Sequence, residues 1–238
     1  MAKPTSKSAK SGKNKPGRFA IAILAAGKGT RLKSRRPKVL HEIAGKPLLA
    51  HVVAAAREVV PPQNIFAIVG YEAERVREAL ASTGINFVLQ REQRGTGHAL
   101  MEARNALKNF KTVLVLSGDV PLIGAKTIKR VRDFHRAHRA AMTILTAEPS
   151  DPTGYGRIFR KQVKGKVSNE VERIVEQKSL RGTEGEQREV NAGMYAFATK
   201  PLYAHIGKLK TDNAHHEYYL TDMVALLGNC LLYTSRCV

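Results

Sequence analysis

A short apolar stretch, Phe19–Leu24, leads directly into a loop rich in glycine and in basic residues. Residues 24–47 read LAAGKGTRLKSRRPKVLHEIAGKP. Gly27 and Gly29 lack a Cβ, so backbone N–H groups there can approach an anion closely. Cations in this segment include Lys28, Arg31, Lys33 and Lys38, which put positive charge where a polyphosphate would lie. A strand that ends in such a loop predicts an α/β fold with a nucleotide-phosphate site at the strand end.

The spacing of this loop excludes two common phosphate-binding motifs. The pattern G-x-x-x-x-G-K-[ST] is absent. The dinucleotide pattern G-x-G-x-x-G fails because Leu32 replaces its third glycine, and no acidic residue closes a second strand about 20 residues on. What remains is Thr-Arg at residues 30–31 and Pro-Lys at residues 37–38, where Pro37 stiffens the approach to Lys38. The alternative is an ordinary basic loop without a ligand.

The net charge of +20 is concentrated near the N-terminus. Residues 1–41 hold twelve of the 40 Lys and Arg residues and no acid, and six of the twelve lie in residues 1–18. This first stretch has almost nothing to bury, so we interpret it as a disordered basic arm. Such an arm either contacts nucleic acid through phosphates or only keeps the chain in solution.

Composition otherwise indicates a cytoplasmic globular protein. Hydrophobic residues make up 43% of the chain, enough for a core, and no run is long enough to span a membrane. The N-terminus lacks the apolar region of a secretory signal. The two cysteines, Cys230 and Cys237, exclude a disulfide scaffold and fit a reducing compartment.

Strand and helix patterns alternate from Phe19 onward, which predicts a mostly parallel sheet flanked by helices on both faces. Expected strands cover residues 19–24, 64–69, 85–89 and 113–116, and expected helices begin at Pro47 and cover residues 72–81, 96–107, 126–137 and 218–227. Between residues 141 and 197 we expect strands joined by turns, at 141–147, 156–160, 171–176 and 190–197. The prediction is a nucleotide-binding α/β half followed by a strand-rich half for a second substrate.

Asp119 follows a buried strand in the segment VLVLSGDVPL. Ligands of open α/β sheets collect at the carboxyl ends of the strands. One carboxylate among phosphate-seeking cations indicates a Mg²⁺ ligand, because Mg²⁺ commonly uses one or two carboxylates together with substrate phosphates. The alternative is an aspartate that caps a helix.

Two further segments carry polar groups suited to binding. In QREQRGTGHA (residues 90–99), the amide of Gln90 suits a pyrimidine edge, and Gly95 and Thr96 offer backbone N–H groups and a hydroxyl. We expect His98 to pack or cap rather than act as a base. Downstream, Gly156, Glu176 and Asn191 are of the kind that hold sugar hydroxyls and an acetamido group. His215 and His216 are expected in a solvated loop.

Eight segments taken together resemble the bacterial N-acetylglucosamine-1-phosphate uridylyltransferase domain. They are LAAGKGTR, RPKVLHEIAGKP, QREQRGTGHA, SGDVPL, PTGYGRI, IVEQK, EVNAGMYAF and EYYLTDMVALL, in that family's order and spacing. The likeness runs from about Phe19 to Leu227. It implies the nucleotide-diphospho-sugar transferase fold, a cytoplasmic enzyme, and formation of UDP-N-acetylglucosamine and pyrophosphate from UTP and N-acetylglucosamine 1-phosphate with Mg²⁺, for cell-wall and lipopolysaccharide precursors.

The resemblance also implies roles for individual residues. Arg31 and Lys38 hold phosphates and are the catalytic cations, and Asp119 binds the metal. The implied nucleotide site comprises Leu24, Ala25, Ala26, Gly27, Lys38, Gln90, Gly95 and Thr96. The implied site for the sugar phosphate comprises Ser117, Gly118, Asp119, Gly156, Glu176 and Asn191.

The chain departs from the family at its C-terminus. Members usually supply a second metal ligand, an asparagine, beyond the point that matches Leu227, and then continue into a left-handed β-helix with acetyltransferase activity. Here residues 228–238 form a tail unrelated to that pattern. We therefore expect no acetyltransferase activity, impaired uridylyl transfer, and a homo-oligomer only in a longer form. The chain is interpreted as a truncated or interrupted reading of a longer protein.

Two other functions stay open at this point. One is a pyrophosphorylase for another sugar phosphate such as glucose 1-phosphate, which the glycine loop and Asp119 do not distinguish. The other is a basic nucleic-acid binder without catalysis. Against the second, the chain has no Trp and only 6% aromatic residues, so it lacks a stacking platform for single strands.

Overall fold

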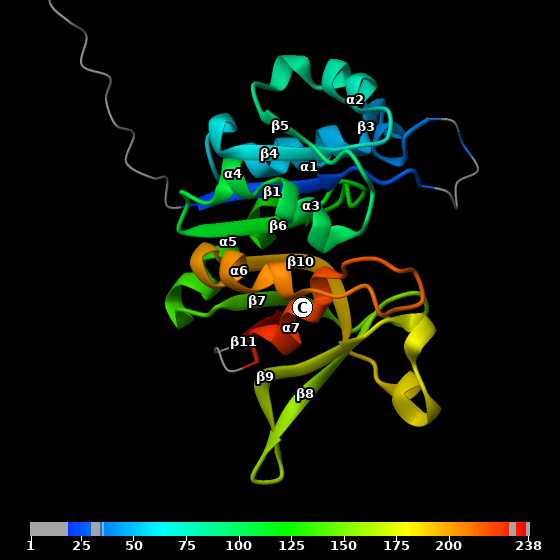
Figure 1. The fold of residues 1–238 in the computed structure, drawn as a ribbon, viewed down its shortest axis with the longest axis vertical. Helices are drawn as coiled ribbons and strands as arrows, with labels where there is room; N and C mark the ends of the chain where they lie inside the picture. The colour runs from blue at the N-terminus through cyan, green and yellow to red at the C-terminus, as the bar shows by residue number, and fades with distance from the viewer. Residues whose placement is uncertain (1–18, 30–33, 35, 229–231, 237–238) are drawn as a thin grey trace, which may run out of the picture.

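The computed structural model describes residues 19–29, 34, 36–228 and 232–236, and its centre is a nine-stranded mixed sheet. The main path has the order β11-β7-β10-β6-β1-β4-β5. Its strands are β1 (Phe19–Ala25), β4 (Ile65–Val69), β5 (Asn86–Leu89), β6 (Thr112–Ser117), β7 (Met142–Ala147), β10 (Val190–Ala198) and β11 (Leu232–Arg236). The order places the first strand in the middle of the sheet (Figure 1).

Four of the six pairings along this path are parallel, and the two antiparallel ones both involve β10. In β1, Ile23 lies opposite Leu116 of β6 and Ala67 of β4. The three strands are almost continuously buried because helices cover both faces, which explains their unbroken apolar sequences. The nucleotide-diphospho-sugar transferase architecture expected from the sequence is confirmed.

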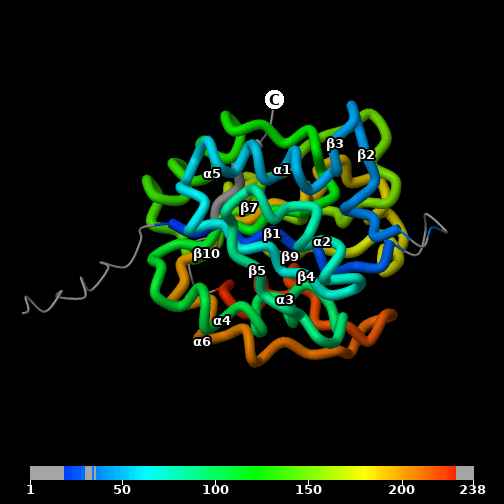
Figure 2. The backbone as a smooth tube through the Cα atoms, turned by 90° about the horizontal axis from the view of Figure 1, so that it is seen from above, coloured from blue at the N-terminus to red at the C-terminus, as the bar shows by residue number. Residues whose placement is uncertain are grey.

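Helices form one layer on each side of the sheet, as Figure 2 shows for α1 and α5 on one side and α3, α4 and α6 on the other. The helices are α1 (Leu48–Arg57), α2 (Ala73–Ala79), α3 (Thr96–Glu102), α4 (Arg104–Leu107), α5 (Ala125–His138), α6 (Thr199–His205) and α7 (Met223–Leu226). The short 3₁₀ helices are η2 (Lys38–Leu40), η3 (Pro62–Asn64), η4 (Ala81–Thr83), η5 (Gln177–Ser179), η6 (Gly182–Glu186), η7 (Ile206–Lys208) and η8 (Leu220–Asp222). The sheet thus separates two apolar clusters.

Helical spacing explains how these helices face the core. In α1, Leu49, Val52, Val53 and Ala56 are buried, at the i, i+3, i+4, i+7 positions of one helix face. They join the cluster under α5. A helix that buries one stripe in this way is fixed in its rotation about its own axis.

The strand-rich half is built around the hairpin of β8 (Arg157–Val163) and β9 (Lys166–Val175), which branches from β10. A smaller hairpin pairs β2 (Glu42–Ile43) with β3 (Lys46–Pro47). A buried ion pair holds the larger hairpin in place, since Arg160 donates to the carboxylate of Glu189 from Nε at 2.7 Å and from Nη2 at 2.5 Å. The strands β7, β8, β9 and β10 are the turn-linked strands expected between residues 141 and 197.

Several expected elements differ in extent from the structure. The helix expected over 96–107 is divided at Ala103 into α3 and α4. The helix expected over 218–227 is wrong in extent, because the chain stays extended until Tyr219 and forms only η8 and α7. Neither α6 nor the β2–β3 hairpin was expected from the periodicity. Among the described residues, no helix combines the length and apolar character that crossing a bilayer requires.

The tail at residues 228–238 continues none of the patterns that precede it, yet part of it adds a strand. Leu232–Arg236 forms β11, which pairs in parallel with β7 from Met142 to Thr146. The basic arm at residues 1–18 lies outside the described residues.

Candidate active site

The glycine loop and Asp119 meet where β1 and β6 end. The N–H of Gly118 donates to the carbonyl of Leu24 at 2.9 Å, which joins the two strand ends. A Cβ on Gly118 would lie 2.9 Å from that oxygen, so the close approach requires glycine. The chain leaves β1 toward β4 on one side, whereas β6 lies on the other, and such a switch point is where open α/β sheets bind ligands.

Lys38 reaches this point from η2. Pro37 precedes the turn and its carbonyl accepts from Leu40, which fixes the approach as the sequence predicted. Nζ of Lys38 lies 2.5 Å from Oδ2 of Asp119, and both side chains remain partly exposed, at 43% and 30%. Gly29 has φ +66°, and a Cβ there would lie 2.6 Å from Cβ of Lys38. Any side chain at residue 29 therefore displaces the lysine.

Asp119 does not cap a helix. It lies in a turn after β6, and the following helix α5 is preceded by Gly124 instead. Among the described residues, no cluster of three or more His, Cys, Asp or Glu side chains forms a metal cage. A single, partly exposed carboxylate at the strand ends fits Mg²⁺, which takes few protein ligands and completes its shell with water and substrate oxygens.

The second loop is held by its own polar groups. Gln90 is only 3% exposed, and its Nε2 donates to the carbonyl of Gly95 at 3.1 Å and lies 3.1 Å from Nδ1 of His98. The amide nitrogen is therefore engaged within the protein. His98 also lies 3.5 Å from Glu102, so the structure places it within the helix as a packing residue.

Gly95 allows this loop to pack against the segment that precedes η8. Its φ is +106°, and a Cβ there would lie 2.6 Å from the carbonyl oxygen of Tyr218. Hydrogen bonds join the segments, among them those from the N–H of Gly97 to the carbonyl of Tyr218 at 2.8 Å and from the N–H of Leu220 to Oγ1 of Thr96 at 3.0 Å. Thr96 is therefore positioned by residues far along the chain.

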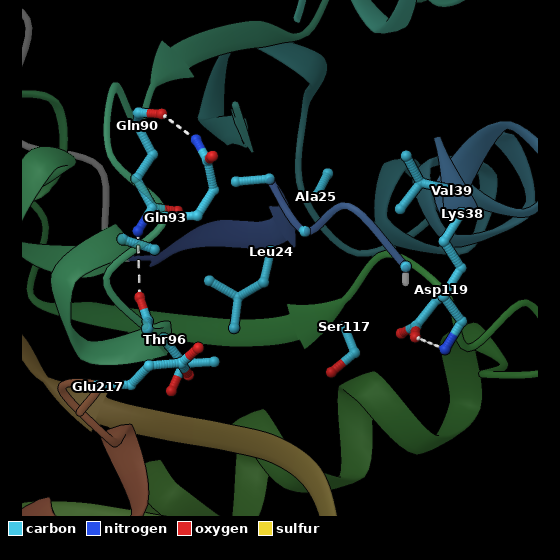
Figure 3. A pocket seen from close by; sticks show the side chains of 15 residues that line it. Leu24, Ala25, Lys38, Val39, Gln90, Gln93, Thr96, Ser117, Asp119 and Glu217 are labelled. Carbon is cyan, nitrogen blue, oxygen red and sulfur yellow. Dashed lines mark hydrogen bonds and ion pairs between the residues drawn. The ribbon is translucent and has the colours of Figure 1, made fainter. Parts of the chain in front are cut away.

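These parts enclose a cavity of about 320 Å³, within the usual size range of small-molecule sites. In Figure 3, Lys38 and Asp119 face each other at one end, and Gln90, Gln93 and Thr96 lie at the other. The lining residues expected from the sequence are Leu24, Ala25, Ala26, Gly27, Lys38, Gln90, Gly95, Thr96, Ser117 and Asp119. Arg31 lies outside the described residues.

A second cavity of about 270 Å³ is lined by two further predicted residues, Glu176 and Asn191. Gly156 is not among its described lining residues, but its carbonyl accepts from the N–H of Asn191 at 2.9 Å. Oε1 of Glu176 accepts from Oγ1 of Thr221 at 3.3 Å. Burial raises the pKa of Glu176 above its usual range. Asn191 donates to the hydroxyl of Tyr195 at 2.7 Å, which leaves its carbonyl to hold the turn at Gly193.

The two cavities share Thr96 and Glu217 in their walls. A nucleotide in the first cavity and a sugar in the second would therefore lie next to each other. Six of the lining residues were assigned no site role from the sequence. Gln93 and Lys178 lie inside two of the quoted motifs, and the other four lie beyond Asn191, the last residue that was assigned a role: His215, Glu217, Tyr219 and Thr221. The segment EYYLTD, which carries three of them, was the signal that could have identified them.

Comparison with known proteins identifies the family of the chain. Residues 21–217 match the MobA-like NTP transferase domain, and the chain belongs to that family. It is therefore a nucleotidyltransferase domain.

Among individual proteins, the chain is 67% identical over 211 residues to the "Bifunctional protein GlmU" of Koribacter versatilis (strain Ellin345), covering 89% of this chain and 45% of that protein. It is 48% identical over 210 residues to the protein of the same name from Lactococcus lactis subsp. lactis (strain IL1403), covering 88% and 44%. The chain thus spans less than half the length of these relatives.

Solved structures show the same fold at low sequence identity. A UDP-glucose pyrophosphorylase complexed with UDP-glucose superposes with a TM-score of 0.70 at 17% identity, covering 92% of this chain and 90% of that one. A CMP:2-keto-3-deoxy-manno-octonic acid synthetase complexed with CTP gives 0.69 at 18%, covering 93% and 90%.

Proposed function

We propose that this domain transfers a uridylyl group from UTP to N-acetylglucosamine 1-phosphate, releasing pyrophosphate and UDP-N-acetylglucosamine. The observation that carries the proposal is the pair of adjoining cavities, one with Lys38 and Asp119 at the strand ends and one with Glu176 and Asn191. The 67% identical relative supports the same assignment. Glucose 1-phosphate is the alternative sugar phosphate.

The sugar phosphate is already an anionic nucleophile, so no general base is required. The protein aligns two polyanions and offsets their charge, which is the main contribution of protein groups to phosphoryl-type transfer. The N–H groups of the glycine loop face the triphosphate, and Lys38 stabilises the charge that develops on the phosphates. Once a triphosphate enters, its oxygens compete with Asp119 for this ammonium.

Asp119 would be the residue that holds Mg²⁺, and the bound ion would supply neutralisation of the phosphate charge. In the neighbouring cavity, the carboxylate of Glu176 accepts from hydroxyl groups of the sugar. Asn191 and Tyr195 shape the wall that faces the acetamido group.

The test measures pyrophosphate release from UTP with N-acetylglucosamine 1-phosphate, with Mg²⁺ or with EDTA, in parallel with glucose 1-phosphate. We expect release only with Mg²⁺, preference for the N-acetylated sugar, and loss of turnover in Asp119→Ala. A chimera carrying the Koribacter relative's segment beyond the match to Leu227 is assayed alongside. The proposal fails if both proteins are silent with every sugar phosphate, or if glucose 1-phosphate is preferred.

A further inference from the structure

A third cavity lies at the opposite edge of the sheet, between α4, the start of β6, and α6. Its volume is about 620 Å³, and its described lining residues are Arg104, Lys108, Phe110, Lys111, Thr199, Lys200, Tyr203 and Ala204. Lys111 immediately precedes β6, whereas Ser117 and Asp119 lie at the other end of that strand. A six-residue strand spans roughly 20 Å, so this cavity is separate from the candidate active site.

The charge of this cavity is one-sided. Four of its lining residues are cations and none carries a carboxylate. Lys108 donates to the amide oxygen of Asn105 at 3.1 Å, which leaves its charge uncompensated by that contact. The guanidinium of Arg104 lies 5.7 Å from the centre of the Tyr203 ring, which orients it over the aromatic face. Gathering these cations costs electrostatic energy that an anion would offset.

Two of the residues that line the cavity carry a buried hydroxyl group without a partner among the described residues. Oγ1 of Thr199 and the hydroxyl of Tyr203 are buried and have no hydrogen-bond partner among the described residues. Thr199 is 3% exposed and Tyr203 is 8% exposed. A buried hydroxyl without a partner carries a desolvation cost, and most buried polar groups in native proteins have a partner. Both residues can donate to an oxyanion.

Backbone and aromatic contacts fix the positions of the residues that line the cavity. The N–H of Thr199 donates to the carbonyl of Lys111 at 3.0 Å, which fixes the hydroxyl residue relative to the lysine. Phe110 packs edge-on against Phe66 with ring centres 5.8 Å apart, and it remains only partly buried. The backbone segments that carry the cations and hydroxyls are therefore fixed relative to one another.

We propose that this cavity binds the phosphate group of a small ligand, through Lys111, Lys200 and Arg104 together with the hydroxyls of Thr199 and Tyr203. Charge selects an anion, and two neutral O–H donors among the cations suit an oxyanion with several acceptor oxygens. This inference does not depend on the proposed transferase activity.

The test is an NMR titration of the ¹⁵N-labelled chain with inorganic phosphate in one arm and phenyl phosphate in the other. We expect saturable shifts at the amides of Lys111, Thr199 and Lys200, distinguishable from any shifts at Gly27 and Gly95. Tighter binding of phenyl phosphate assigns an organic ester that contacts Phe110, whereas equal binding assigns the inorganic ion, and both support the site.

Substitutions separate the site from general charge effects. The double variant Lys111→Ala/Lys200→Ala should weaken binding by about tenfold, since two exposed cations that would attract the phosphate are lost. The matched control Lys129→Ala/Arg130→Ala removes two exposed cations from α5, on the other face of the sheet, and should leave the affinity unchanged. Equal losses in the two double variants would overturn the proposal.

Thr199→Val provides a readout that a structural role does not give. Removing an unpartnered hydroxyl relieves a desolvation cost, so the melting temperature should stay the same or rise while phosphate affinity falls about threefold. Unchanged affinity in Thr199→Val, or a titration that shifts only the amides of the active-site cavity, also overturns the proposal.

Discussion

The ammonium of Lys38 lies 2.5 Å from the carboxylate of Asp119, although the two residues come from segments far apart in the sequence. Each is the other's partner before substrate arrives, and each is expected to bind something else afterwards. Because both side chains are partly exposed, the pair contributes little to folding stability. The ion pair instead keeps the ammonium and the carboxylate at the strand ends, where each can exchange its partner for a substrate group.

Replacement of this lysine should therefore affect turnover more than folding. We expect Lys38→Ala to lower kcat by about 100-fold, because one charge that stabilises the transition state is lost, with a change in melting temperature of about 2 °C or less. Steady-state pyrophosphate release and thermal unfolding measure the two effects. Lys46→Ala, which removes an exposed lysine from β3, is the control and should retain full activity. Normal turnover in Lys38→Ala would contradict the assigned role.

The loop at Gly95 should be intolerant of a side chain. Gly95→Ala places a Cβ 2.6 Å from the carbonyl oxygen of Tyr218 on a backbone with φ +106°, so we expect a loss of about 1–3 kcal/mol in unfolding free energy and weaker UTP binding. Urea unfolding and calorimetric titration with UTP measure these effects. Gly124→Ala is the control, because a Cβ there meets nothing within 4 Å and its φ is negative. Similar losses in both variants would exclude the steric explanation.

Glu176 should make stability depend on pH. Burial raises its pKa in the folded state, so the folded protein holds the proton more tightly than the unfolded chain. The resulting stabilisation is complete below the unfolded pKa and is lost as the pH rises through the folded pKa. Glu176→Gln should therefore gain stability relative to the wild type at neutral pH, with the difference shrinking in acid, while the KM for the sugar phosphate rises. A stability difference independent of pH would contradict the burial argument.

His135 should act in the opposite direction. It is 3% exposed with Nδ1 2.9 Å from Oγ1 of Thr143, and burial lowers its pKa from 6.5 to about 4. The contribution of neutral His135 to folding stability is then fully present above the unfolded pKa. It is lost as the pH falls from 6.5 to about 4, which lowers the free energy of unfolding by on the order of 3 kcal/mol. Chemical denaturation between pH 7 and pH 4 measures the slope. His135→Gln should flatten it, and an unchanged slope would assign the effect to other groups.

Sequence patterns predicted most of what positions the site. Phe19–Leu24 and residues 113–116 are buried on both faces, so their apolar runs identified them as strands, and the alternation around them identified the fold. Gly27, Lys38, Gln90 and Asp119 were placed together because strand ends share one edge of a sheet. The pairing of Lys38 with Asp119 could not be read from the sequence, since it depends on how η2 folds back.

Other features depend on tertiary contacts with no local signal. Residues 218–222 have helical periodicity, yet the backbone stays extended as far as Tyr219. The reason is a pair of hydrogen bonds to the loop at residues 90–99: the carbonyl of Tyr218 accepts from the N–H of Gly97, and the N–H of Tyr218 donates back to that loop. Ala103 interrupts a continuous helical pattern for no reason visible in its propensity. The third cavity escaped prediction because its cations come from three elements and only folding gathers them.

Thr96 and Glu217 border both cavities of the candidate active site, and this has a consequence for the order of events during turnover. Whichever ligand binds first contacts residues that the second ligand must also contact. We expect the two ligands to bind in a preferred sequence rather than independently, and the product, which occupies both compartments at once, to hold the protein in its most rigid state.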